Sequence, residues 1–231
     1  MKTIGIIGGT SWESTVTYYQ IINEKIKEAL GGLSSGKILL YSVNFAEVEK
    51  HMAKEEWNEV AEILGDAAVR LEKGGADFIL LATNTLHIVS DEIQKRVSIP
   101  MIHIGDITAK VLKSAGIKKA ALLGTRFTMQ KDFMRKKFTS NSLNVIIPDD
   151  EEMKKIDEII FKELCLGIVK EESRKYYLDV ISHLKEQGAE CVVLGCTEIG
   201  MLINKDNSPL PVFDTAIIHP EEAAKLALIE K

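Results

Sequence analysis

Two side chains that can transfer protons occupy matching places in this sequence. Thr83 and Cys196 each follow a short apolar segment, and each lies eight residues after a glycine, Gly75 or Gly188. A thiol and a hydroxyl can give a proton to carbon, or take one from it, when neighbouring groups adjust their acidity. The pair therefore suggests proton-transfer chemistry, provided that the fold brings both side chains to one substrate.

The two positions match because the sequence repeats its own plan. Thr83 lies 74 residues after Gly9, and Cys196 lies 72 residues after Gly124. Two sheets could merely look alike, but agreement at three landmarks favours duplication. The corresponding segments are residues 2–10 with 118–125, 71–77 with 184–190, and 99–101 with 210–212.

Apolar segments rich in β-branched residues alternate with longer amphipathic segments, which predicts an α/β fold of two pseudo-symmetric parallel-sheet domains. We expect residues 1–100 plus 208–231 to form the first domain and residues 101–207 the second. Ser11 or Ser14 is the expected cap of the first helix. Strands are expected over residues 3–7, 37–45, 78–82, 101–104, 120–123 and 191–194, and helices over 13–30, 55–73, 86–95, 107–114, 151–169, 173–187 and 221–229.

The predicted fold indicates where a substrate would bind. Ligands of parallel α/β sheets bind beyond the carboxyl ends of the strands, where Thr83 and Cys196 lie. If the halves face each other, the active site occupies the cleft between them, and the two side chains suit inversion of a carbon centre from opposite faces. We expect Cys196 to be the base, because an apparent helix start at Thr197-Glu198 would lower its pKa. Cys165 and Cys191 are expected to be structural.

Short polar side chains beside the strand ends are candidate substrate ligands. Their N–H and hydroxyl groups could hold the carboxylates of a dicarboxylic amino acid, as helix N-termini hold anions. The alternative is that they serve only as helix caps and turns. These residues are Thr10, Asn84, Thr85, Thr125, Thr197 and Glu198.

No cofactor and no metal are expected. The first glycine turn has the pattern Gly5-x-x-Gly8-Gly9, which differs from the dinucleotide pattern G-x-G-x-x-G, and no acidic residue at Val43-Asn44 is placed for a ribose. No lysine lies in a phosphate-site context that would suggest pyridoxal phosphate, and the cysteines and histidines lack metal-site spacing.

Composition narrows the partners to small molecules. The 29 basic and 34 acidic side chains are interspersed and give a net charge of -5, so no nucleic-acid partner is expected. No segment approaches the roughly 18 apolar residues of a membrane span, and no signal-peptide pattern is present. Three sparse cysteines predict reduced thiols and a cytoplasmic location.

Three motifs resemble those of the aspartate/glutamate racemase family. Residues 8–15, followed by Tyr18-Tyr19 and Ile22-Asn23, look like the opening motif of the family; residues 83–87, T-N-T-L-H, resemble its first catalytic signature C-N-T-x-H; and residues 195–198 resemble its second, G-C-T-E. The resemblance covers essentially the whole chain. It implies two Rossmann-like domains, a homodimer, an acidic amino-acid substrate, no cofactor and a relay between two cysteines.

The main departure is Thr83, where most members carry the first cysteine. It resembles the branch of L-aspartate/glutamate-specific racemases that pair threonine with cysteine. The hypothesis is that Cys196 removes the α-proton of the L-substrate while Thr83 donates to the opposite face. No clear equivalents exist of the Arg and Lys that some aspartate-specific members use, so glutamate and aspartate both stay open, with a preference for glutamate and with Met52 and Glu163 as weaker candidates for the pocket.

Two other functions are compatible with these residues. A cysteine-dependent decarboxylase of a malonate-type acid would need only Cys196 as a proton donor. A non-catalytic binding protein for acidic amino acids would need neither Cys196 nor Thr83 to react.

Overall fold

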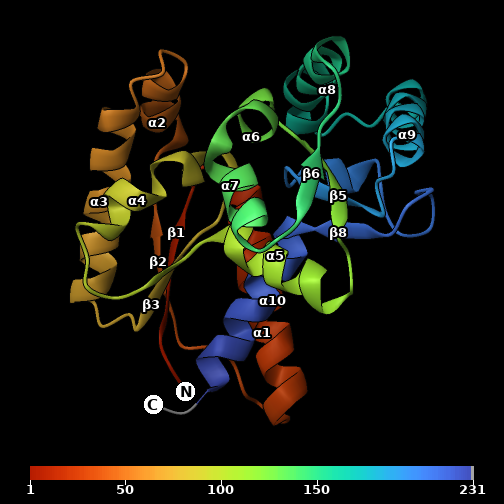
Figure 1. Cartoon of the computed structure of the whole chain (residues 1–231). Helices are drawn as coiled ribbons and strands as arrows, with labels where there is room; N and C mark the ends of the chain where they lie inside the picture. Colours follow the sequence, from red (N-terminus) through yellow and green to blue (C-terminus); the bar gives the residue numbers. More distant parts are fainter. Residues whose placement is uncertain (230–231) are drawn as a thin grey trace. The chain divides into compact units, whose positions relative to one another are not determined.

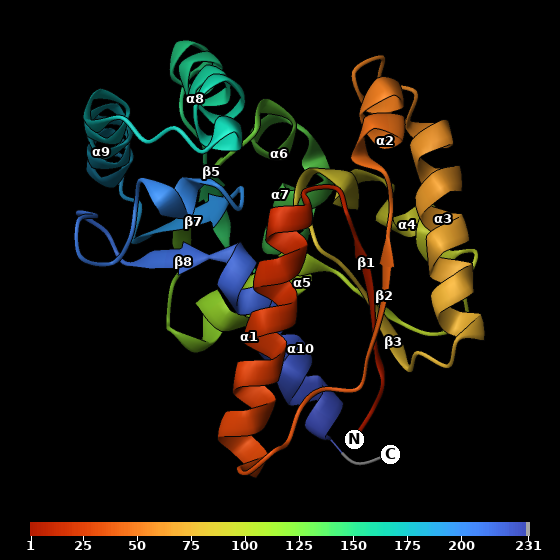
Figure 2. The same ribbon diagram turned by 180° about the vertical axis from the view of Figure 1, so that it is seen from behind.

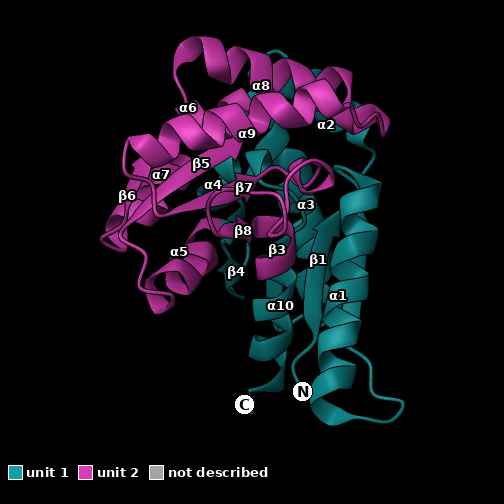
Figure 3. Ribbon diagram, turned by 90° about the vertical axis from the view of Figure 1, so that its right-hand side faces the viewer, with its two compact units in different colours: residues 1–104, 219–231 teal, residues 105–218 magenta. Residues whose placement is uncertain are grey.

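The computed structural model describes residues 1–229, and in it strands and helices alternate to form two four-stranded parallel sheets (Figures 1 and 2). The chain divides into two compact units, residues 1–104 with 219–231 and residues 105–218 (Figure 3). The predicted α/β class with two parallel-sheet units is confirmed.

The first sheet has the strand order β2-β1-β3-β4. Its two inner strands, β1 and β3, are buried between two layers of helices, which explains why both are apolar throughout. The elements of this unit are β1 (Ile4–Gly8), α1 (Trp12–Leu30), β2 (Ile38–Ser42), α2 (Phe45–Met52), α3 (Trp57–Lys73), β3 (Phe78–Leu81), the 3-10 helix η1 (Thr85–Val89), α4 (Ser90–Gln94) and β4 (Met101–Ile102).

Alternation along β1 and β3 divides the core of this unit in two. Ile4 and Ile6 face α1 and the C-terminal helix α10 (Thr215–Leu228), where Tyr18 and Ile22 are buried. Ile7 faces the other layer, formed by α2, α3, η1 and α4. Figure 1 shows α2 and α3 on one side of this sheet, and Figure 2 shows α1 on the other.

The second sheet has the order β6-β5-β7-β8, which is the order of the first sheet shifted by four strands. In Figure 3, α8 and α9 cover one side of it and α5 lies on the other. The elements are α5 (Ile104–Ser114), β5 (Lys119–Gly124), α6 (Arg126–Gln130), α7 (Asp132–Ser140), β6 (Asn144–Ile146), α8 (Asp150–Lys162), the 3-10 helix η2 (Leu164–Leu166), α9 (Glu171–Glu186), β7 (Cys191–Gly195), the 3-10 helix η3 (Ile199–Met201) and β8 (Val212–Asp214).

Individual hydrogen bonds of the first unit recur at corresponding positions within the second. The Ile79 N–H donates to Pro100 O, and the Val192 N–H donates to Pro211 O, both at 2.9 Å. Asp77 accepts the N–H of Thr3 at 2.7 Å, and Glu190 accepts the N–H of Lys119 at 3.1 Å. These pairs occupy corresponding places, so the repeat read in the sequence is a repeat of structure.

Some predicted boundaries were wrong. The strand expected over residues 37–45 ends at Ser42, because the Asn44 side chain accepts the N–H of Ala46 at 3.2 Å and thereby caps α2, a helix that was not predicted. The helices α6 and α7 and the strand β6 were also not predicted. Residues 208–218 lie in the second unit rather than the first, because β8 pairs with β7.

Other local predictions are confirmed. Ser11 caps α1 by accepting the N–H of Ser14 at 3.2 Å, and Gly31 ends this helix with φ of 73°. None of the helices among residues 1–229 combines the length and the hydropathy that a membrane span requires.

Candidate active site

Thr83 and Cys196 occupy equivalent positions in the two sheets. Leu81 of β3 pairs with Ile7 of β1, and Leu194 of β7 pairs with Leu123 of β5. Each candidate catalytic residue lies two positions beyond its paired leucine. Thr83 and Cys196 therefore each follow the carboxyl end of an inner strand, the place where parallel sheets bind ligands.

In the first unit, a compact turn presents Thr83, which is half-buried. Its N–H donates to Leu81 O at 2.9 Å, and its carbonyl oxygen lies 2.8 Å from Nδ1 of His87. Asn84, which is buried, accepts the His87 N–H through its carbonyl oxygen at 3.1 Å. The backbone of this turn is thus held by His87 at two points, and Thr85 continues from it into η1.

Thr10 follows β1, the strand next to β3. Gly9 precedes it with φ of 87°, and a Cβ there would lie 2.2 Å from Val43 O, so only glycine fits this turn. Among residues 1–229, the Thr10 hydroxyl is buried and has no hydrogen-bond partner. Ser11, and not Thr10, caps α1. An unsatisfied buried hydroxyl costs about 1–3 kcal/mol, which a ligand oxygen or nitrogen would offset.

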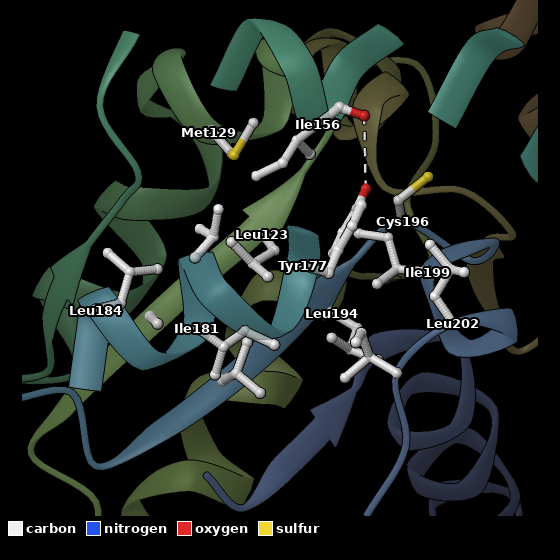
Figure 4. Packing of buried hydrophobic residues seen from close by; sticks show 14 of the residues in the cluster. Leu123, Met129, Ile156, Tyr177, Ile181, Leu184, Leu194, Cys196, Ile199 and Leu202 are labelled. Atoms are coloured by element: carbon white, nitrogen blue, oxygen red, sulfur yellow. Dashed lines mark hydrogen bonds between the residues drawn. The ribbon is translucent and has the colours of Figure 1, made fainter. Parts of the chain in front are cut away.

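In the second unit, Cys196 shares one carboxylate oxygen with its neighbour. The Cys196 thiol donates to Oε2 of Glu198 at 3.0 Å, and the Thr197 hydroxyl donates to the same oxygen at 2.6 Å. Figure 4 shows Cys196 at the margin of the buried cluster beside Tyr177, with its sulfur pointing away from the aliphatic side chains. The residue as a whole is 8% exposed.

The prediction that a following helix lowers the pKa of Cys196 was wrong. Burial, followed by the charge of Glu198 and its hydrogen bond with the thiol, raises the pKa of Cys196 well above its usual range. The helix that was expected to lower this pKa does not begin at Thr197. Only the three-residue 3-10 helix Ile199–Met201 follows, and it is too short to supply a strong dipole.

Asp214 is a carboxyl group of this unit that sequence reasoning missed. It ends β8, and its Oδ1 accepts the N–H of Ala216 at 2.8 Å. A Cβ on Gly200 would lie 2.9 Å from its Oδ2, so the carboxyl packs against the loop that carries Glu198. Burial, reinforced by the charge of Glu198, raises the pKa of Asp214 to about 6. The internal repeat could have pointed to Asp214, because it lies three residues after Pro211, as the polar residue His103 lies three residues after Pro100.

The raised pKa of Asp214 makes folding stability depend on pH. Its proton is bound more tightly in the folded protein, so the stabilisation is complete below pH 3.8 and is lost as pH rises to about 6. Relative to Asp214→Asn, the wild-type free energy of unfolding should fall by about 3 kcal/mol in total as pH rises from well below the lower of these two pKa values to well above the higher. Urea titrations at several pH values measure the difference. Asp206→Asn removes an exposed charge and serves as the control; parallel curves for wild type and Asp214→Asn would contradict the assignment.

The remaining candidates occupy several roles. Thr125 follows β5, and its hydroxyl oxygen accepts the Thr128 N–H at 3.3 Å, so it caps α6 as the alternative reading expected. Met52 ends α2 and packs against the core of the first unit. Glu163 ends α8, where it accepts hydrogen bonds from Ser173 at 2.5 Å and from Lys170 at 3.1 Å; these contacts, that of Ser173 above all, lower its pKa.

The sequence model of the Asp/Glu/Hydantoin racemase family matches residues 7–223. The chain belongs to this family. Among characterised relatives, the broad specificity amino-acid racemase RacX of Bacillus subtilis is 27% identical over 219 residues, which cover 92% of each chain. The prediction of an amino-acid racemase, an isomerase, is therefore confirmed at the level of the family.

Two solved structures agree with this membership of the racemase family. The crystal structure of an Asp/Glu racemase from Yersinia pestis has a TM-score of 0.95 and 47% identity, and the match covers 99% of this chain and 100% of the other. An aspartate racemase homologue from Pyrococcus horikoshii has a TM-score of 0.86 and 38% identity, with 98% and 99% of the two chains covered. The similarity to both extends over the whole architecture described above.

Proposed function

We propose that this racemase inverts an acidic amino acid, glutamate or aspartate, without a cofactor, by proton transfer at Cα between Cys196 and Thr83. The equivalence of these two residues in two units of identical strand order carries the proposal. A substrate held between the carboxyl ends of β3 and β7 would meet a hydroxyl on one face and a thiol on the other. Such a two-sided arrangement inverts a carbon centre with little movement of the substrate.

The raised pKa of Cys196 suits this chemistry. The thiol proton passes to Oε2 of Glu198, which already accepts its hydrogen bond at 3.0 Å. The resulting thiolate is poorly solvated and strongly basic. The difference between the pKa of the thiol and the very high pKa of an amino-acid Cα–H is therefore smaller than for an exposed cysteine. The thiolate then takes the α-proton and returns to the thiol, and a carbanion is left on the substrate.

Thr83 completes the inversion from the opposite face. Its hydroxyl gives a proton to the carbanion, a strong base, and solvent restores the proton to the threonine oxygen. Glu198 then releases to solvent the proton that it took from Cys196, and all three side chains return to their starting state. A threonine alkoxide is far too basic to persist at neutral pH, so Thr83 works as a donor better than as a base. We therefore propose that turnover of the L-substrate, with Cys196 as its base, is faster than turnover of the D-substrate at matched saturation.

The polar groups beside the two strand ends supply the binding site in this proposal. The unpartnered hydroxyl of Thr10 supports a role as a ligand, and Asn84, Thr85, Thr125 and Thr197 add further donors. Of the two weaker candidates, Met52 offers an apolar wall, and Glu163 would attract the ammonium group rather than a carboxylate. Glutamate is the preferred substrate.

Incubation with L-glutamate and with L-aspartate in deuterated water tests the proposal. Proton NMR follows loss of the α-proton signal, and chiral chromatography follows formation of the D-enantiomer. A racemase produces both, at equal final amounts of the two enantiomers. Binding without exchange would indicate a binding protein, and release of carbon dioxide from an arylmalonate, without exchange of either amino acid, would indicate a decarboxylase.

We also propose a cytoplasmic homodimer. Cys165, Cys191 and Cys196 are all free thiols, which supports a reducing compartment. The dimer follows from the resemblance to aspartate/glutamate racemases, and light scattering after size-exclusion chromatography measures its mass.

A further inference from the structure

We propose that His87 is a positioning residue for Thr83, acting as a neutral imidazole that carries its proton on Nδ1. The inference rests on the proposed function, because it assigns the group that holds one of the two proton-transfer residues in place. It does not make His87 a catalytic residue, since the imidazole contacts the backbone of the Thr83 turn and not the reacting hydroxyl.

Two backbone groups fix the tautomer of His87. The carbonyl oxygen of Thr83 lies 2.8 Å from Nδ1, and since a carbonyl only accepts, Nδ1 must carry the hydrogen. The N–H of Ile104 points to Nε2 at 3.2 Å, so Nε2 must be bare. One neutral tautomer satisfies both contacts, and it ties the turn after β3 to the first residue of α5.

The surroundings of His87 oppose a charge on its ring. The side chain is fully buried, and the His103 and His219 rings lie 4.6 Å and 5.8 Å away, centroid to centroid. Burial, with smaller contributions from these two histidines, lowers the pKa of His87 well below its usual range. Burial also lowers the pKa of His219 to about 4. Its Nε2 donates to Ile102 O at 2.9 Å, so in the neutral ring Nδ1 is left to accept from the Tyr18 hydroxyl, 2.9 Å away.

Comparison of the two repeats shows that the contact between the His87 ring and the Thr83 backbone has no counterpart at Cys196. His87 lies four residues after Thr83, and the residue four after Cys196 is Gly200. A Cβ on Gly200 would lie 2.9 Å from Oδ2 of Asp214, so a side chain at this position would have to displace that carboxyl group. The Cys196 thiol is held directly by Glu198. For Thr83 the structure instead fixes the backbone, which sets where its hydroxyl can point.

Two variants separate the contacts of His87. In His87→Asn, the amide nitrogen can take the place of Nδ1 and still donate to Thr83 O. In His87→Gln, the amide oxygen can take the place of Nε2 and accept from Ile104, while the donor to Thr83 is lost. The exposed His183 provides the control His183→Gln.

Exchange and inversion of the L-substrate in deuterated water are the readouts. Exchange in the recovered L-enantiomer needs only Cys196, whereas inversion also needs Thr83. For His87→Gln we expect kcat for inversion to fall roughly 10-fold to 100-fold, as for a misplaced reacting group, with KM within about twofold and exchange retained. His87→Asn should stay closer to wild type. The ratio of exchange to inversion therefore rises in the Gln variant alone.

Equal loss of exchange and inversion in both variants would overturn the inference, as would unchanged inversion in His87→Gln. Nitrogen-15 NMR of the histidine rings in the wild-type protein gives a second test that needs no variant. It must show His87 as the Nδ1–H tautomer between pH 6 and 8; an Nε2–H or charged ring contradicts the inference. If the wild-type protein neither exchanges nor inverts the substrate, the proposed function fails, whatever the tautomer.

Discussion

Replacing Cys196 by serine should lower the rate of racemisation by about 10³-fold, within the range of 10²-fold to 10⁴-fold for loss of a general acid–base group. Serine keeps the approximate size of the side chain and its hydrogen bond to Glu198, so the change removes acidity rather than packing. A hydroxyl is far less acidic than a thiol, and Glu198 cannot convert it to a usable base. Chiral chromatography of glutamate and aspartate after timed incubation measures the loss.

Cys165 provides the matched control for this prediction. It belongs to the same unit and is exposed, so Cys165→Ser should leave the rate within about twofold of wild type, as surface substitutions normally do. Cys196→Ser should also abolish α-proton exchange of the L-enantiomer, because Cys196 is the base for that enantiomer. Racemisation within tenfold of wild type in Cys196→Ser would show that another group removes the α-proton.

The order of strands and helices could be predicted from the sequence because the same pattern occurs in both halves of the chain. Apolar strands, glycine turns and prolines recur at matching intervals, and each recurrence constrains the other. The positions of Thr83 and Cys196 follow from this repeat alone. The helix α2 was harder to predict, because Asn44 directly follows a largely apolar segment and its capping hydrogen bond forms only when the chain turns there.

The electrostatics of the site could not be predicted from the same pattern. The pKa of Cys196 depends on which way the Glu198 side chain points and on how deeply the thiol is buried, and neither is encoded in the order of residues. Asp214 was missed for a related reason: its importance comes from burial against Gly200, a contact between distant parts of the chain. Local sequence motifs therefore indicate which residues could react, whereas tertiary packing decides whether their pKa values are raised or lowered.

The two repeats have diverged in the groups that support each proton-transfer residue. On the cysteine side a carboxylate accepts the thiol proton, and a second buried carboxyl, Asp214, lies behind the same loop. On the threonine side the equivalent region holds His87 and His103, in contact with each other through their rings. Carboxyl groups therefore lie near the residue that we propose as a base, and the neutral imidazole of His87 lies near the residue that we propose as a donor.

Replacing Thr83 tests this division of roles most directly. In Thr83→Cys a second thiol stands where the hydroxyl was, and its thiolate is accessible at neutral pH, so the D-substrate gains a usable base. We expect the D-to-L rate to rise about tenfold or more, given that general bases contribute 10²-fold to 10⁴-fold. Initial rates from pure D-glutamate and pure L-glutamate measure the two directions, and the final mixture stays equimolar because a catalyst leaves the equilibrium unchanged.

Thr83→Ala supplies the complementary result. Without a donor on that face, inversion should fall by about 10²-fold or more, while α-proton exchange of the L-substrate through Cys196 persists. An alanine variant that loses exchange and inversion together would mean that Thr83 is needed to bind the substrate and not to donate a proton. A cysteine variant whose D-to-L rate does not rise would show that position 83 does not face the α-proton of the D-enantiomer, and the two-sided mechanism would then have to be abandoned.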